Sequence, residues 1–226
     1  MRIGIIGAGQ IGGTLTRRLR ALGHEVVVAN SRDPDSLTEL ATATGARAAW
    51  AHEVPSLVEL VIVAIPEGAV ERLPQGLFDG VPLRIPVVDT GNYYPRERDG
   101  TIADIEAGMP ESQWVSQTLG RPVIKAFNTL HAGSLMGKGM PHGAQGRIAV
   151  PVAGDDAQGK QMVMQLIDQL GFDPIDAGSL AESWRQQPGT PIYGAQLNVD
   201  DAKAALIAAR RERPAAYRGD TSGARP

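Results

Sequence analysis

Three glycines close to the first residue have a spacing that suits phosphate binding. Gly7, Gly9 and Gly12 form a G-x-G-x-x-G pattern, with Gln10 and Ile11 inside it. Gly7 permits a tight turn, Gly9 lets the backbone approach a pyrophosphate, and Gly12 lets a helix pack closely against a strand. The free N–H groups and positive dipole end of that helix would face the phosphates. The pattern predicts a dinucleotide-binding turn.

The segments around the turn supply the context that the motif needs. Residues 2–6 are a short apolar run, typical of a buried parallel strand. Apolar side chains then recur at helical spacing through residues 11–22, and residues 25–29 are predicted to form a second strand. A strand, glycine turn, helix and strand within about 30 residues form the unit in which this motif binds a dinucleotide. A glycine turn without a ligand is the alternative, and this context disfavours it.

The residues after the second predicted strand bear on the choice between NAD and NADP. An Asp or Glu there would bind the ribose 2′-hydroxyl of NAD and repel a 2′-phosphate. Here the strand ends in Asn30, Ser31 and Arg32, which offer a hydroxyl and a planar guanidinium to a phosphate. NADP is therefore favoured. A solvated surface charge is the alternative role for Arg32, since Asp33 and Asp35 lie close by in the sequence.

Further predicted strand ends would complete the crevice, because ligands in such sheets lie at the carboxyl ends of the strands. Ala64, Ile65 and Pro66 would pack against the adenosine or the nicotinamide. Asn92 and Asn128 would hydrogen-bond a ribose or the nicotinamide amide. Both asparagines are also turn-forming residues, so a purely structural role is the alternative.

The order of elements predicts an α/β fold with a doubly wound (Rossmann), mostly parallel sheet and a small C-terminal α/β extension. Strands are predicted at residues 46–50, 61–65, 86–89 and 122–127, and in the extension at 147–153 and 172–176. Residues 1–128 would form the dinucleotide-binding domain. Residues 129–226 would form the extension, which contributes to the cleft and ends in an Arg-rich tail expected to lie against the body or a partner subunit.

Composition excludes several classes of function. The 22 basic and 25 acidic side chains give a net charge of −3, and aromatic residues make up 4%, so no nucleic-acid partner is expected. The absence of Cys excludes zinc–thiolate sites, iron–sulfur clusters and thiol nucleophiles. No apolar run reaches the roughly 20 residues of a membrane span, and no secretory signal is visible. We expect a cytoplasmic protein with no membrane partner.

Few side chains suggest themselves as catalytic groups. The sequence has no Ser/His/Asp set and no H-E-x-x-H spacing, so no metal site is predicted. His131 lies just beyond a predicted strand end and could act as a general acid in carbonyl or imine reduction, although an ordinary loop residue is the alternative. His24 is expected at the surface. Hydride transfer between two bound cofactors needs no side-chain acid, because the cofactors carry the chemistry.

Six segments together resemble the NADP oxidoreductase family related to coenzyme F-420-dependent NADP reductase. They are GAGQIG at 7–12, NSR at 30–32, DTGNYY at 89–94, ESQWV at 111–115, KAFNTL at 125–130 and VAGDD at 152–156. The resemblance runs from residue 2 to about residue 181. It implies a homodimer that exchanges hydride between NADP and the deazaflavin F-420, stacked near the nicotinamide. Ser31 and Arg32 match the family's 2′-phosphate binders, and Ile65 and Pro66 match the segment along the nicotinamide.

The chain departs from the family pattern at two places. Ser36 stands where the reductases carry a Lys, and residues 128–131 (NTLH) replace a His-Thr-Ile-Pro-like segment at the deazaflavin cleft. We predict an NADP-dependent oxidoreductase whose small-molecule acceptor is F-420 or a flavin-like compound. The alternatives are an NADP-binding redox sensor without turnover and a reductase of a small carbonyl or imine substrate. Known dehydrogenases of the latter type use a larger helical second domain than residues 129–226 provide.

Overall fold

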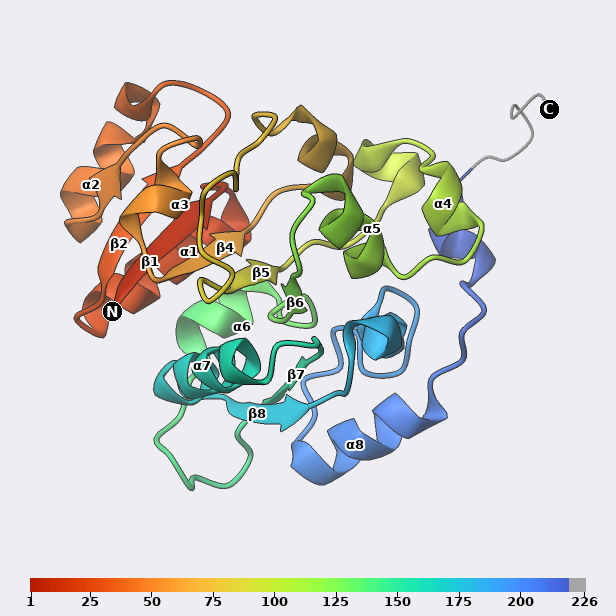
Figure 1. The fold of residues 1–226 in the computed structure, drawn as a ribbon. Coiled ribbons are helices and arrows are strands. Elements are labelled where there is room, and N and C mark those ends of the chain that lie inside the picture. Colours follow the sequence, from red (N-terminus) through yellow and green to blue (C-terminus); the bar gives the residue numbers. More distant parts are fainter. Residues whose placement is uncertain (220–226) are drawn as a thin grey trace.

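The computed structural model describes residues 1–219 and contains a six-stranded parallel sheet (Figure 1). Its strand order is β3-β2-β1-β4-β5-β6. The strands are β1 (Arg2–Ile6), β2 (Glu25–Ala29), β3 (Arg47–Ala48), β4 (Leu60–Val63), β5 (Val87–Asp89) and β6 (Ile124–Lys125). The order reverses between β1 and β4, which is where ligands bind in sheets of this kind. The predicted doubly wound fold is confirmed.

Helices cover both faces of this sheet. They are α1 (Gln10–Ala21), α2 (Thr38–Thr44), α3 (Val54–Leu57), α4 (Ala103–Glu106), α5 (Glu111–Thr118) and α6 (Ala132–Gly137). Short turns of tighter or wider helix lie at η1 (Pro34–Leu37), η2 (Glu67–Arg72) and η3 (Pro95–Asp99). Neighbouring residues of one strand enter different cores: Val26 and Val28 pack with Leu15 of α1, whereas Val27 packs with Val54 of α3. Burial on both faces explains the continuous apolar strands.

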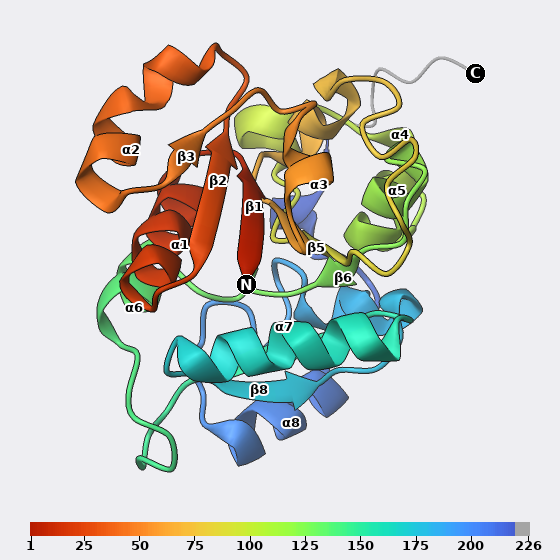
Figure 2. The same cartoon turned by 60° about the vertical axis from the view of Figure 1, so that its left-hand side comes forward.

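A second, two-stranded parallel sheet lies beside β6. It consists of β7 (Ala149–Val152) and β8 (Asp173–Asp176), with α7 (Ala157–Gln169) and α8 (Val199–Ala208) on either side of it (Figure 2). The short η4 (Leu180–Gln186) and η5 (Ala215–Tyr217) complete this part of the chain. An antiparallel bridge between Lys125 and Ala153 connects the two sheets. The small C-terminal α/β extension is thus present as expected.

Several predicted boundaries are wrong. The strand expected at 122–127 is only two residues long: the Ala126 N–H still donates to the Asp89 carbonyl at 3.2 Å, but Phe127 then turns away with φ 64°. The strand expected at 46–50 is also only two residues long, as β3 at the opposite edge of the sheet. Helix α4 and the turns of η4 were not predicted, since neither has a clear apolar period.

The first part of the predicted tail packs against the body of the protein. The blue segment after α8 runs back to α4 (Figure 1). There the Arg213 guanidinium pairs with the buried Glu111 carboxylate at 2.7 Å, and the Gly219 N–H donates to Glu106 Oε1 at 2.6 Å. Residues 220–226 of the predicted tail lie outside the described residues. Within residues 1–219, no helix has the combined length and apolar character that crossing a bilayer requires.

Candidate functional site

The glycine turn has the geometry of a dinucleotide cradle. Gly7 has φ 111°, and a Cβ there would lie 2.2 Å from the Ala64 carbonyl oxygen. A Cβ on Gly12 would lie 1.8 Å from the Gly7 carbonyl oxygen. Helix α1 therefore approaches the turn more closely than a residue with a side chain at this position would allow. A Cβ on Gly9 would meet no protein atom within 4 Å. The space over the amino end of α1 is therefore open, and the three glycines fit the roles that their spacing predicts.

A cavity of about 340 Å³ opens at the carboxyl ends of β1, β4, β5 and β6, directly above this turn. The predicted site residues that line it are Gly9, Gln10, Ile11, Ala64, Ile65, Pro66, Asn92, Asn128 and His131. Thus four separate strand ends of the sequence come together in one cleft. Gly7 and Gly12 lie in the turn beneath it without lining it, and Asn30, Ser31 and Arg32 lie outside it, at the tip of β2.

The tip of β2 is a compact turn held by Asn30. The Asn30 side-chain oxygen accepts from the Arg32 N–H at 2.8 Å, and its amide nitrogen donates to Ser36 Oγ at 3.0 Å. Ser36 Oγ also donates to the Asp33 carbonyl at 2.6 Å. Asn30 and Ser36 therefore shape the turn, and the side chains of Ser31 and Arg32 are left exposed. Among residues 1–219, no carboxylate forms an ion pair with Arg32.

The two cleft asparagines are bonded to each other and to Gln186 of η4. Asn128 Nδ2 donates to Asn92 Oδ1 at 3.0 Å and to the Gln186 carbonyl at 2.7 Å, while Asn92 Nδ2 donates to the Asn128 carbonyl at 3.0 Å. Gln186 Nε2 donates to Asn128 Oδ1 at 2.9 Å. Asn128 is 4% exposed, so these bonds are buried. The network connects η4 to the end of β6. Nothing in the sequence pattern pointed to Gln186.

A pair of tyrosines stands at the cleft. The hydroxyl groups of Tyr94 and Tyr193 are hydrogen-bonded, and both residues line the cavity together with His131 and Arg98. The Arg98 guanidinium lies 5.1 Å from the centre of the Tyr94 ring. Burial raises the pKa of both phenols, so each hydroxyl keeps its proton at neutral pH. Tyr193 was not predicted, because it lies in an irregular segment between η4 and α8.

His131 and His24 lie in different surroundings. His131 is exposed and lines the cleft, where it begins α6 without capping it through its side chain. The surface position expected for His24 is wrong: that residue is 9% exposed, and its Nε2 lies 2.9 Å from Gln169 Oε1 of α7. His24 therefore helps to fix α7 against the sheet and takes no part in the cleft.

A buried ionic cluster supports the cleft loop from below. Lys125 Nζ donates to Asp89 Oδ2 at 2.9 Å and to the Gly91 carbonyl at 2.7 Å, and it lies 3.7 Å from Glu67 Oε1. Burial raises the pKa of Glu67 well above its usual value, and the nearby Asp89 carboxylate adds to the rise. Burial alone would lower the pKa of Lys125, but the surrounding carboxylates raise it overall. A charged Lys125 thus holds the Gly91 backbone under the cleft.

Comparison with known proteins agrees with this geometry. Residues 2–93 match the model of the family described as NADP oxidoreductase, coenzyme F420-dependent. The amino-terminal part of the chain is thus similar to this family. A 73-residue segment is 56% identical to the Escherichia coli protein YjhV, over 32% of this chain and 46% of that protein, so the match spans less than half of that curated relative.

Two crystal structures show the same fold in related proteins. A hypothetical protein from Sinorhizobium meliloti is 30% identical, with a TM-score of 0.73 over 87% of this chain and 95% of that one. A candidate F420-dependent NADP reductase from Arthrobacter sp. FB24 is 24% identical, with a TM-score of 0.66 over 80% and 86% of the respective chains. The chain thus has a Rossmann fold, and its residues 2–93 are similar to NADP oxidoreductases.

Proposed function

We propose that this protein transfers hydride between NADP(H) and an F-420 deazaflavin or a flavin-like acceptor. The observation that carries the proposal is the single cleft above the glycine turn, in which Ile65 and Pro66 lie near Tyr193. NADPH supplies the hydride when it is bound. The open space over Gly9 would accept its pyrophosphate, and Ala64, Ile65 and Pro66 would offer an apolar wall to its rings.

The exposed tip of β2 supports a preference for NADP. Ser31 and Arg32 would hold the 2′-phosphate through a hydroxyl and a planar guanidinium. Asn30 keeps this turn in place through hydrogen bonds of its own, so the two side chains need no rearrangement of the backbone to reach a ligand. We further propose that residues 1–128 form the cofactor half of the cleft and that residues 129–226 contribute the acceptor half through Tyr193 and His131.

A second candidate function, the reduction of a small carbonyl or imine, is favoured by the tyrosine pair. Such a reaction adds hydride to the carbon and needs a proton for the oxygen or nitrogen. Tyr193, hydrogen-bonded to Tyr94, would donate that proton, with His131 nearby as another acid. The same hydroxyl would serve a deazaflavin or flavin, whose reduction also takes up a proton.

An acceptor screen tests the proposal. Purified protein is mixed with NADPH or NADH and with F-420, FMN, riboflavin, a ferric chelate, a ketone or a cyclic imine, and the loss of reduced-nicotinamide absorbance is followed. Turnover with F-420 or a flavin supports the first function, and turnover with only the ketone or imine supports the second. NADPH binding without turnover on any acceptor would refute both and leave the redox sensor.

The cofactor preference is tested with matched arginine variants. Arg32→Ala removes a charge-assisted contact of about 1.5–3 kcal/mol, so Kd for NADPH should rise about 10-fold to 150-fold, while Kd for NADH stays near the wild-type value. Arg84→Ala, an exposed arginine before β5, is the control and should change neither. An equal loss of both nucleotides would contradict the NADP preference. The homodimer and the cytoplasmic location stay predictions.

A further inference from the structure

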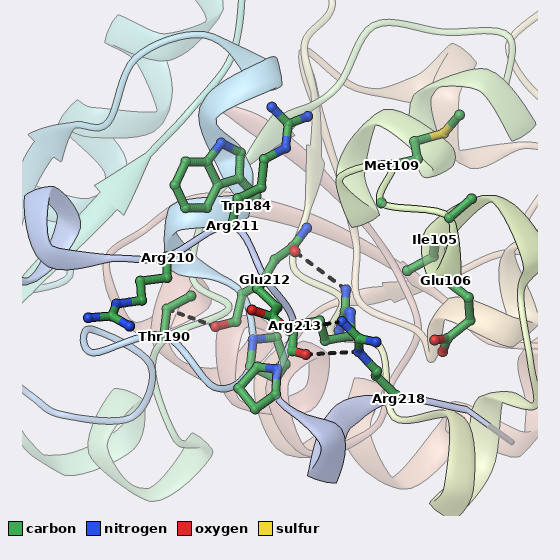
Figure 3. A pocket seen from close by; sticks show the side chains of 15 residues that line it. Ile105, Glu106, Met109, Trp184, Thr190, Arg210, Arg211, Glu212, Arg213 and Arg218 are labelled. Carbon is green, nitrogen blue, oxygen red and sulfur yellow. Dashed lines mark hydrogen bonds and ion pairs between the residues drawn. The ribbon is translucent and has the colours of Figure 1, made fainter. Parts of the chain in front are cut away.

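A second cavity, of about 200 Å³, lies between α4, η4 and the C-terminal segment, and none of the predicted cofactor-binding residues lines it (Figure 3). Four arginines line this second cavity: Arg210, Arg211, Arg213 and Arg218. Only two carboxylates line it, those of Glu106 and Glu212. The cavity is therefore positively charged, in a chain whose net charge is −3.

Three buried hydrogen-bond donors of the second cavity have no partner among residues 1–219. They are Trp184 Nε1, Gln187 Nε2 and Arg213 Nη1. Gln187 is 8% exposed, so bulk solvent does not reach its amide in this conformation. Buried polar groups in folded proteins are nearly always paired, and each exception calls for an explanation. All three atoms donate, so the group that would pair with them is a hydrogen-bond acceptor.

These donors are held firmly in place. Arg213 Nη2 donates to Glu111 Oε1 at 2.7 Å and to Gln187 Oε1 at 3.4 Å, and its guanidinium lies 5.2 Å from the centre of the Tyr93 ring. The Arg185 guanidinium stacks over Trp184 at 4.4 Å. Figure 3 shows Arg213 and Arg218 next to each other between Trp184 on one side and Ile105 on the other. A preorganised set of donors of this kind favours ligand binding, because little ordering is needed.

We propose that the second cavity binds a small oxyanion, either a phosphate or a carboxylate. Both present several acceptor oxygens, and arginine forks bind both through paired charge-assisted hydrogen bonds. The volume lies below the roughly 300–1,000 Å³ of sites for drug-sized ligands, so the ligand has few heavy atoms. The anion would lie against the half-exposed Arg218 and near Trp184, which lines the same cavity. This site is separate from the hydride-transfer cleft and does not depend on the proposed function.

The indole N–H signal of Trp184 provides a direct test. The chain has 3 tryptophans, and the Trp184→Phe variant identifies which of the three indole signals belongs to Trp184. The full chain, labelled with ¹⁵N, is titrated with inorganic phosphate, with acetate or with citrate, each against sodium chloride at equal ionic strength. We expect the Trp184 indole proton to move downfield and saturate, while the signals of Trp50 and Trp114 stay in place. The anion that saturates at the lowest concentration identifies the ligand class.

Matched charge variants make the test specific. Arg218→Gln should weaken the saturating anion about tenfold, because it removes one charge-assisted contact, and Arg84→Gln should leave its affinity unchanged. Shifts confined to the backbone around Gly7–Gly12 would show that phosphate binds only in the cofactor cleft, and this would overturn the proposal. A Trp184 signal that does not move with any of the three anions, as expected for a cavity that holds only water, would also overturn it. A signal that moves equally with chloride would do the same. Equal affinities in the two arginine variants would also contradict it.

Discussion

Gly9 and Gly12 belong to one motif, yet the structure predicts opposite consequences when each is replaced by alanine. At Gly9 the new methyl group would meet no protein atom within 4 Å, and the residue has φ −73°, which any amino acid adopts. Gly9 is the N-cap of α1, where glycine and alanine differ by about 1 kcal/mol or less. Gly9→Ala should therefore fold normally, with the melting temperature lowered by about 4 °C at most.

The same methyl group should nevertheless block the cofactor. It would project into the space that the pyrophosphate would occupy and push it away from the N–H groups of α1. The loss of one charge-assisted hydrogen bond costs about 1.5–3 kcal/mol, which corresponds to a 10-fold to 150-fold rise in Kd for NADPH. Binding is measured by titrating the fluorescence of the reduced nicotinamide.

Gly12→Ala is the opposite case. Its methyl group would lie 1.8 Å from the Gly7 carbonyl oxygen, a backbone atom that cannot rotate away. Separating α1 from the turn should cost about 3 kcal/mol or more, and the gain in helix propensity offsets only about 1 kcal/mol, which leaves a net loss of about 2 kcal/mol or more. At about 2–4 °C per kcal/mol, the net loss lowers the melting temperature by at least about 4–8 °C in calorimetry without nucleotide. Wild-type NADPH affinity in Gly9→Ala, or an unchanged melting temperature in Gly12→Ala, would refute this account of the turn.

Three further predictions concern buried polar groups. Glu67→Gln should be more stable than the wild type at pH 8, and its advantage in melting temperature should shrink as the pH falls toward 4.5. The reason is that burial raises the pKa of Glu67, so only the unfolded state ionises readily as the pH rises. A difference in melting temperature that does not depend on pH would contradict this. Lys125→Met should lose about 3–5 kcal/mol in urea unfolding, because Asp89 stays buried without its partner; a loss below 1 kcal/mol would argue against a charged Lys125. Asn128→Ala should lose about 1–3 kcal/mol and expose η4 to proteolysis, since Gln186 loses its bonds; resistance equal to wild type would count against this network.

The first fifty residues show what a sequence can predict. Strand β1, helix α1 and strand β2 appear where the apolar period and the glycines place them, because each is fixed by local pattern and by burial on both faces. The edges of the sheet were predicted less well. Strand β6 ends early because the backbone turns at Phe127, with φ 64°, and its outer edge bonds to Ala153 beside the second sheet, a contact that no local pattern encodes.

The residues of the cleft likewise include some that could be predicted from the sequence and some that could not. The glycines and the segment Ala64 to Pro66 were predicted correctly to lie together, because topology alone brings the carboxyl ends of parallel strands to one edge. Tyr193 could not be predicted, since it lies in the irregular chain between η4 and α8, and neither could Gln186, since η4 has no clear apolar period. Their positions depend on how the second sheet packs beside β6, which is a tertiary property.

The two asparagines show how residue type and position can suggest a role before the hydrogen bonds are known. Asn92 and Asn128 lie at strand ends where an amide would suit a ribose, yet their side chains bond to each other and to Gln186. A ligand that displaced these bonds would have to replace all of them, because Asn128 is almost completely buried. Cleft groups with exposed or reorientable polar atoms are better candidates for ligand contact. Among these, Tyr193 and His131 come from beyond residue 128, which is why the acceptor half of the proposed reaction is assigned to the C-terminal extension.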